Sequence, residues 1–425
     1  MATTRRSFLK VVGGGAAALA AARPLGVAPA FAQGAPIKVG VLAIKSGIAA
    51  EVGEAGLRGV QFAADKINAT GGILGRKLEL VVEEETSPKD TVDRFRRLAL
   101  QHKVDVVSGV ISTGVGLAIG AAAEELKTIW LAWDGTTQKG VEEAMPKVRY
   151  SFRSTDNEAE AIGASILAVK YFKGQFKTIA GVNPDYSYGR NNWEAFQAIL
   201  KRYGIEATPV SDLWPKLGTS DFTSHVATLQ RAKPDLIFSS FWAADVSIFL
   251  RQAHAAGLLE KTKLVFPVSG IIHWTMKKTF TPEGMLYGYN TWYFDHPQSS
   301  PLAKEFVKWY GDSFQGYPSY ECDHAYFTIA AYKAAAEKAA KAAGGKWPDK
   351  EQIIDALAGI EVESMSGTRR YRNDHIMEAD FFQGLSTHKN RYDFVTLDPI
   401  ERLRVDQVQK PSGVGLYDWI NSWKV

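Results

Sequence analysis

The stretch 111–120, ISTGVGLAIG, carries residues that could hold an anionic group. It follows an apolar run, VDVVSGV, that predicts a strand, and it opens a segment with helical spacing. The hydroxyl groups of Ser112 and Thr113 would face a ligand carboxylate where helix N-terminal N–H groups also favour negative charge. We therefore expect a small-anion site here, with Ser112 and Thr113 as ligand-binding residues.

The same stretch supports a rival interpretation as a dinucleotide loop. Gly114, Gly116 and Gly120 follow a strand, and Asp134 lies 20 residues after Gly114 at the end of the next strand, where a ribose-binding acid is expected. This rival predicts an exported NAD(P)-dependent oxidoreductase. Against it, the turn is the third strand-to-helix turn of the chain, whereas the glycine pattern normally marks the first.

Aromatic residues follow three further predicted strands. Tyr188 comes after one strand, Trp242 after the next, and His273 with Trp274 after a third. Ligands of open α/β sheets bind outside the carboxyl ends of the strands. Aromatic rings at that edge can cover an apolar or ring-bearing ligand.

Signatures of catalysis and of metal binding are scarce. The chain has no G-x-S-x-G, no H-E-x-x-H and no P-loop sequence. The segment ECDH, 321–324, lies in a helical pattern and is interpreted as structural. The eight histidines show no metal-ligand spacing. We expect no enzyme activity, no metal and no cofactor.

The first 32 residues predict an export signal. Arg5 and Arg6 precede a short Ala/Gly-rich apolar stretch, and Ala30 and Ala32 give a small-x-small cleavage pattern. The arginine pair matches the twin-arginine type, which predicts a periplasmic protein cleaved near Ala32. This segment holds four basic residues and no acid. The net charge of +4 therefore belongs to the signal, and the rest of the chain is close to neutral. A nearly neutral chain has no global attraction to nucleic acid or to anionic membranes.

From Ile37 onward predicted strands and helices alternate in two series, the second starting after RYSFRSTD. Such alternation implies parallel sheets covered by helices on both faces. The two series hold too many strands for one compact open sheet, so we expect two doubly wound α/β lobes. Cys322 is the only cysteine, which excludes a disulfide within the chain.

Four segments carry a resemblance to a known family: INATGGILGRKLELV, DYSYGRNNWEAF, SDFTSHVATLQRAKPDLIF and FLRQAHAAGL. Together with the run that begins IKVGVLAIKSG, they resemble type I periplasmic solute-binding proteins of ABC importers. Within that family, they are similar to the leucine/isoleucine/valine-binding group. The resemblance covers roughly residues 36–395.

The resemblance implies a two-lobed clamp that closes on its ligand by hinge motion. The three hinge segments would lie near 149–154, 284–292 and 358–365. Lobe 1 would comprise 36–152 plus 287–358, lobe 2 would comprise 153–286 plus 359–408, and 409–425 would form a C-terminal tail. Its partners would be a membrane permease and an ATPase, and we expect a monomer. A ligand-sensing receptor domain of the same fold is a second rival.

The resemblance also implies a set of ligand contacts: Ser112, Thr113, Trp133, Asp134, Gly135, Thr136, Tyr188, Trp242 and Ser269. The family's acidic partner for a ligand ammonium should fall near Ser269, where this chain has no acid. Either Asp134 takes that role from the opposite lobe, or the ligand is a carboxylate or amide without an amine. The tryptophans favour a larger or ring-bearing ligand.

Overall fold

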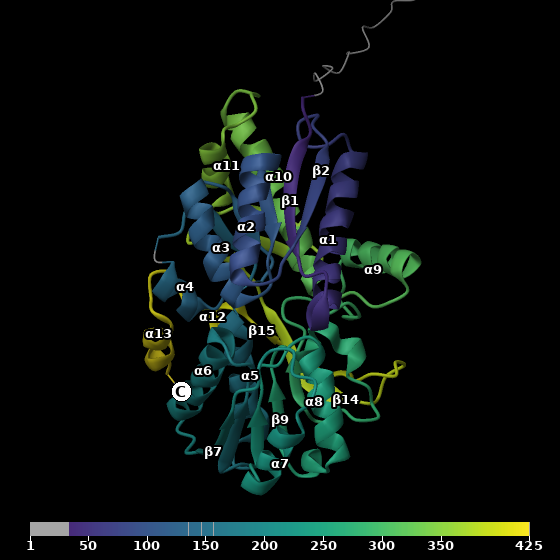
Figure 1. Ribbon diagram of the computed structural model, residues 1–425, viewed down its shortest axis with the longest axis vertical. Helices are drawn as coiled ribbons and strands as arrows, with labels where there is room; N and C mark the ends of the chain where they lie inside the picture. Colours follow the sequence, from purple (N-terminus) through teal and green to yellow (C-terminus); the bar gives the residue numbers. More distant parts are fainter. Residues whose placement is uncertain (1–33, 135, 146, 156, 425) are drawn as a thin grey trace, which may run out of the picture.

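The computed structural model describes residues 34–134, 136–145, 147–155 and 157–424. The predicted signal segment and Gly135 lie outside the described residues. Figure 1 shows an elongated molecule with one sheet and its helices in each half along the longest axis. This arrangement confirms the prediction of two doubly wound α/β lobes.

The first sheet has five parallel strands in the order β2-β1-β3-β4-β5. Its strands are β1 (Ile37–Ala43), β2 (Leu78–Glu84), β3 (Val106–Gly109), β4 (Trp130–Ala132) and β5 (Ser151–Arg153). Strands β3, β4 and β5 are buried at every position. Burial on both faces is expected for a parallel sheet that helices cover on both sides.

Helices pack in pairs around this sheet: α1 with α10, and α2 with α3. Their bounds, with the short elements between them, are η1 (Gly47–Ala49), α1 (Ala50–Ala69), α2 (Pro88–Arg97), η2 (Leu98–His102), α3 (Thr113–Leu126), α4 (Gln138–Ala144) and α10 (Glu321–Ala342). The start of α2 follows its sequence signal, because the Ser87 side chain accepts a hydrogen bond from the Asp90 N–H and Pro88 occupies the first turn.

The second sheet has seven strands in the order β15-β14-β10-β9-β8-β6-β7. They are β6 (Thr178–Val182), β7 (Thr208–Leu213), β8 (Leu236–Phe238), β9 (Lys263–Phe266), β10 (Leu286–Gly288), β14 (Phe381–Thr387) and β15 (Thr396–Leu403). Strands β6 to β10 are parallel, and β14 and β15 add an antiparallel edge. The chain after residue 380 therefore completes this sheet with an antiparallel pair of strands.

Helices α5 and α6 pack together beside this sheet, and α7 and α8 form another pair. The bounds are α5 (Asn157–Phe172), α6 (Ser187–Arg202), α7 (Thr223–Ala232), α8 (Ala244–Ala255), η3 (Leu258–Glu260), η4 (Ser269–Thr275), α12 (Val405–Val408) and α13 (Leu416–Ser422). Short α12 packs on α5, and α13 packs on α6.

The third link between the two sheets differs from the expected 358–365. A small antiparallel sheet occupies that region and packs on α10, which itself packs on α1. The elements of this part are α9 (Pro301–Phe314), α11 (Lys350–Leu357), β11 (Glu361–Ser364), β12 (Gly367–Tyr371) and β13 (Met377–Glu378). Buried Asp323 of α10 accepts hydrogen bonds from Ser364 and Ser366 and holds this sheet in place. After this small sheet, the chain returns to the seven-stranded sheet at β14.

No helix within the described part of the chain is both long enough and apolar enough to span a bilayer.

Candidate ligand-binding site

A buried cavity lies where loops from both large sheets meet. Each lining residue follows the carboxyl end of a strand: Ile111, Thr113, Asp134, Asn157, Glu160, Tyr186, Tyr188, Trp242, Val268 and Ile271. Open α/β sheets bind ligands at this edge.

The structure brings together four of the residues that the sequence singles out. Thr113, Asp134, Tyr188 and Trp242 all line this cavity. Thr113 is the first residue of α3, and its hydroxyl accepts a hydrogen bond from the amide of Asn157 at 3.3 Å. The start of α3, with the partial positive charge of its N-terminus, therefore lies against the cavity.

The turn before α3 already holds an anion that belongs to the protein. The carboxylate of Glu85 accepts hydrogen bonds from the backbone N–H groups of Ile111 and Ser112, each at 2.9 Å. Ser112 does not line the cavity, and its side chain makes no capping bond to α3. The N–H groups of Ile111 and Ser112 are thus already paired within the protein, which leaves those of the first turn of α3 for a ligand carboxylate.

Acidic groups dominate the electrostatics of this region. Burial raises the pKa of Glu85 to about 7, although its two backbone hydrogen bonds act in the opposite direction. Burial, followed by the charge of Glu85, raises the pKa of Asp134 well above its usual range. Burial and then the charges of Asp134, Glu85 and Glu160 raise the pKa of Glu321 in the same way. Cationic groups brought by a ligand would relieve this repulsion.

Aromatic side chains form the opposite wall. The rings of Tyr186 and Tyr188 lie 5.7 Å apart between centroids. The indole N–H of Trp242 donates to the Tyr186 hydroxyl at 3.0 Å, which fixes both rings. The Tyr188 hydroxyl is buried and has no hydrogen-bond partner among the described residues. This wall offers apolar surface together with one hydroxyl group that can bond a ligand.

Three other predicted contact residues lie outside the lining. Trp133 is 0% exposed, and its indole N–H donates to Ser108 Oγ at 2.7 Å. Thr136 is buried and accepts a hydrogen bond from Arg153 at 3.2 Å. The Ser269 hydroxyl donates to the backbone oxygen of Phe266 at 3.0 Å. We therefore do not propose direct ligand contacts for these three residues.

The two further aromatic candidates also have partners elsewhere. His273 is buried and stacks on Phe294, with 4.9 Å between ring centroids, and burial lowers its pKa to about 3. The indole of Trp274 donates to Glu51 at 3.0 Å. Both residues belong to η4, which follows β9, but their side chains do not line the cavity.

Sequence analysis did not single out six residues of this region: Glu85, Asn157, Glu160, Tyr186, Val268 and Ile271. Of these, Tyr186 could have been found, because it lies two residues before Tyr188 at the same strand end. Glu85 follows β2, and only the order of strands in the folded sheet brings it to the loop after β3.

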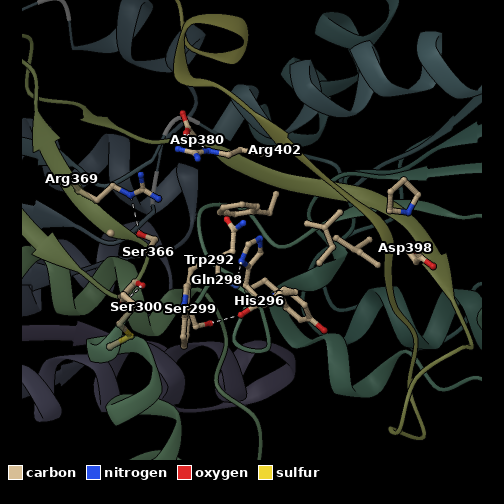
Figure 2. Close-up of a pocket in the computed structure, with 18 residues that line it drawn as sticks. Trp292, His296, Gln298, Ser299, Ser300, Ser366, Arg369, Asp380, Asp398 and Arg402 are labelled. Atoms are coloured by element: carbon tan, nitrogen blue, oxygen red, sulfur yellow. Dashed lines mark hydrogen bonds and ion pairs between the residues drawn. The ribbon is translucent and has the colours of Figure 1, made fainter.

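A larger cavity of about 730 Å³ lies elsewhere, among β12, β14, β15 and the segment after β10. Figure 2 shows Arg369, Asp380 and Arg402 on one side of it and Trp292 and His296 near its middle. Asp380 pairs with Arg402 at 2.6 Å. None of the described sequence-predicted contact residues lines this cavity.

Comparison with known proteins gives one family. The model of the family described as "Periplasmic binding protein" matches residues 36–384. Leu/Ile/Val-binding protein homolog 3 of Brucella melitensis biotype 1 is 25% identical over 350 residues, which cover 80% of this chain and 89% of that protein. Leu/Ile/Val-binding protein homolog 7 of Brucella abortus is 28% identical over 244 residues, 56% of this chain. The chain therefore spans only 59% of the length of that second relative.

Solved structures share the fold. A solute-binding protein of an ABC transporter from Rhodopseudomonas palustris BisB5, in complex with 3,4-dihydroxybenzoic acid, matches with a TM-score of 0.74 and 21% identity. The match covers 87% of this chain and 98% of that one. An amino acid ABC transporter substrate-binding protein from Pseudomonas fluorescens Pf-5 matches with a TM-score of 0.74 and 18% identity, covering 88% and 98%.

Proposed function

The chain belongs to the periplasmic binding protein family, and on that premise we propose that it is the solute-binding subunit of an ABC importer. The proposed solute is a small amino acid with an apolar or aromatic side chain. The observation that carries this proposal is one buried cavity with a helix N-terminus, carboxylates and an aromatic wall. The predicted signal in residues 1–32 would deliver the protein to the periplasm.

An amine on the solute is supported by the charges of the cavity. Asp134 and Glu160 are its two ionisable acids, and the lining includes no lysine, arginine or histidine among the described residues. An ammonium group beside Asp134 would supply the opposite charge that favours the ionised form of that carboxylate. Asp134 thus replaces the acid that the family would place near Ser269.

A carboxylate on the solute is supported by the start of α3. The first intrahelical hydrogen bond of α3 runs from the Gly116 N–H to the Ser112 oxygen. The N–H groups of the preceding first-turn residues have no intrahelical acceptor, as at any helix start. These groups, with the Thr113 hydroxyl, would hold the solute carboxylate.

The apolar part of the solute would lie against Trp242, Tyr186 and Tyr188, with Val268 and Ile271 beside it. An aromatic acid without an amine is the main competitor, since one structural neighbour is solved with 3,4-dihydroxybenzoic acid. In this chain such a solute would place a third carboxylate with Asp134 and Glu160. In a buried cavity that arrangement is less favourable than one in which the solute also brings a cationic group.

We further propose that the solute is captured by lobe closure. Contacts across the two lobes support a closed form: Asn191 of α6 donates to Thr137 at 2.8 Å, Lys139 pairs with Glu194 at 2.6 Å, and Trp274 donates to Glu51. The loaded monomer would then dock on a permease, and an ATPase would drive release of the solute into it.

A thermal-shift panel on residues 33–425 tests this function. The panel contains leucine and phenylalanine, their deaminated acids, their decarboxylated amines, benzoate and NAD. A solute at a hundred times its dissociation constant stabilises the folded state by about 2.7 kcal/mol, which raises the melting temperature by several degrees.

We expect the melting temperature to rise with the amino acids only, because binding requires both the ammonium and the carboxylate of the solute. Shifts with deaminated acids or benzoate alone would show that Asp134 does not bind an ammonium. A shift with NAD alone would favour the oxidoreductase that the glycine pattern allows.

A further inference from the structure

A group of hydrogen-bond acceptors lies behind the cavity, on the side of Asp134 that faces α10. Glu321 is the first residue of α10, and His324 follows one helical turn later on the same face. Both side chains are 0% exposed, and Asp134 is 5% exposed. The three residues therefore form a buried cluster contributed by the loop after β4 and by the start of α10.

The facing atoms of this cluster have no hydrogen-bond partners within the described part of the chain. They are Oδ1 of Asp134, both carboxylate oxygens of Glu321, and Nδ1 of His324. Buried polar atoms in proteins are nearly always paired, so four such atoms in one place need an explanation. A bound ligand that supplies positive charge satisfies all four.

The spacing of these atoms fits one ion. One ligand atom from each of Asp134, Glu321 and His324 lies within 4.8 Å of the other two. His324 Nδ1 lies 3.9 Å from Glu321 Oε2, too far for a hydrogen bond. An ion bound to both Nδ1 and Oε2 would keep these two atoms apart at a similar distance, once the side chains adjust slightly.

The other nitrogen of His324 is held in place. His324 Nε2 and Thr291 Oγ1 lie 2.9 Å apart. With Nε2–H donating to the threonine, Nδ1 presents a lone pair toward Glu321 and Asp134. Metal-binding histidines are oriented in this way by a partner on the second ring nitrogen. Thr291 in turn accepts a hydrogen bond through its backbone oxygen from Arg369.

We propose that Asp134, Glu321 and His324 bind one divalent transition-metal ion. One imidazole with two carboxylates suits ions of the zinc and manganese class better than calcium or magnesium, which prefer oxygen ligands only. The inference extends the proposed function, because Asp134 also lines the solute cavity. Oδ1 of Asp134 would bind the metal, and its other oxygen would face the solute ammonium.

The surrounding charges are consistent with a cation here. The charged groups that act on Glu321 are the carboxylates of Asp134, Glu85 and Glu160. Burial, and then the charge of Arg369, lowers the pKa of His324, so the imidazole stays neutral and able to bind metal. The metal would offset the repulsion among the acids.

Calorimetric titration of untagged, chelator-treated residues 33–425 with ZnCl₂, MnCl₂ and CaCl₂ tests the site. We expect one Zn²⁺ or Mn²⁺ per chain, bound at least about tenfold more tightly than Ca²⁺. Glu321→Gln and His324→Gln should weaken that binding by about tenfold or more, since each loses a ligand. The matched variants Glu143→Gln and His254→Gln, which change exposed residues, should bind metal as the parent chain does.

Two outcomes would overturn the inference. One is the absence of metal binding by the folded parent chain, and the other is equal binding by all four variants. If Glu321→Gln or His324→Gln does not fold, the absorption spectrum of Co²⁺ bound to the parent chain replaces the variant test. Bands typical of nitrogen and oxygen ligands support the site, and their absence overturns it.

Solute titration into the metal-free chain separates the two proposals. Solute binding without metal binding overturns only the metal site, and metal binding without amino-acid binding overturns only the proposed solute.

Discussion

The Oε1 atom of Glu85 lies 2.9 Å from the backbone nitrogen of Ser112 and accepts its hydrogen bond. The other oxygen of Glu85 accepts the N–H of Ile111 at the same distance. The turn that the sequence marks for an anion is thus bound in part by a carboxylate of the protein itself. A solute carboxylate is left with the first turn of α3 and Thr113.

This relationship predicts a pH-dependent difference in stability between the parent chain and Glu85→Gln. Burial raises the pKa of Glu85 from 4.5 to about 7 in the folded state. The stabilisation from the bound proton is therefore full below pH 4.5 and is lost as the pH rises through 7.

The free energy of unfolding of the parent chain minus that of Glu85→Gln should fall by up to about 3 kcal/mol over this interval. Urea unfolding of solute-free and metal-free protein at both ends of the interval measures this change. Because buried histidines titrate alike in both proteins, their contributions cancel. Loss of the Glu85 charge also lowers the raised pKa values of Asp134 and Glu321, which changes the difference in the same direction. A difference that stays constant or rises with pH would contradict the prediction.

Thr113→Val should weaken solute binding by about 1–3 kcal/mol, because a buried solute oxygen loses its hydroxyl partner. Ser112→Ala is the matched control, since Ser112 does not line the cavity and its side chain does not cap α3. Calorimetry with the tightest-binding amino acid of the panel measures both. Equal losses in the two variants would show that the carboxylate lies nearer to Ser112 than proposed.

Trp242→Ala should weaken binding of apolar and aromatic amino acids by about 2 kcal/mol or more, as buried aromatic contacts at binding sites commonly do. Glycine and alanine, which do not reach the aromatic wall, should lose less. Trp214→Ala provides the control, because Trp214 packs under Arg190 outside the cavity. A similar loss for every amino acid would indicate that Trp242 supports the loop rather than contacting the side chain.

Gly56→Ala should destabilise the fold by about 1–3 kcal/mol through overpacking. A Cβ atom at this position would lie 2.3 Å from Cζ3 of the buried Trp133 ring. Gly114→Ala, where a Cβ atom meets nothing within 4 Å, should keep or slightly raise the stability. Melting temperatures of the two variants decide this, and equal values would contradict the packing assigned to Trp133.

The sequence predicts the sheets and helices well, because strands and helices have distinct apolar periods and because caps such as Ser87 are local. Gly120 is also explained by local packing: a Cβ atom there would lie 1.9 Å from Cε of Met145. That glycine need not serve a dinucleotide.

Which residues line the cavity is set by tertiary contacts that no local pattern shows. Trp133 and Asp134 are adjacent at one strand end, yet Trp133 packs against Gly56 while Asp134 lines the cavity. Glu321 and His324 lie nearly 190 residues beyond Asp134, so no local pattern connects them. In the sequence ECDH they resemble any polar helix start.

The most direct test of the proposed solute is a calorimetric titration with three matched compounds: leucine, 4-methylpentanoate and 3-methylbutylamine. They share one apolar chain and differ only in the charged groups that Thr113 with α3 and Asp134 are proposed to hold. We expect leucine alone to bind the parent chain tightly, and Asp134→Asn to weaken leucine by about 1.5–3 kcal/mol. Binding of 4-methylpentanoate as tight as that of leucine, unchanged by Asp134→Asn, would contradict the account.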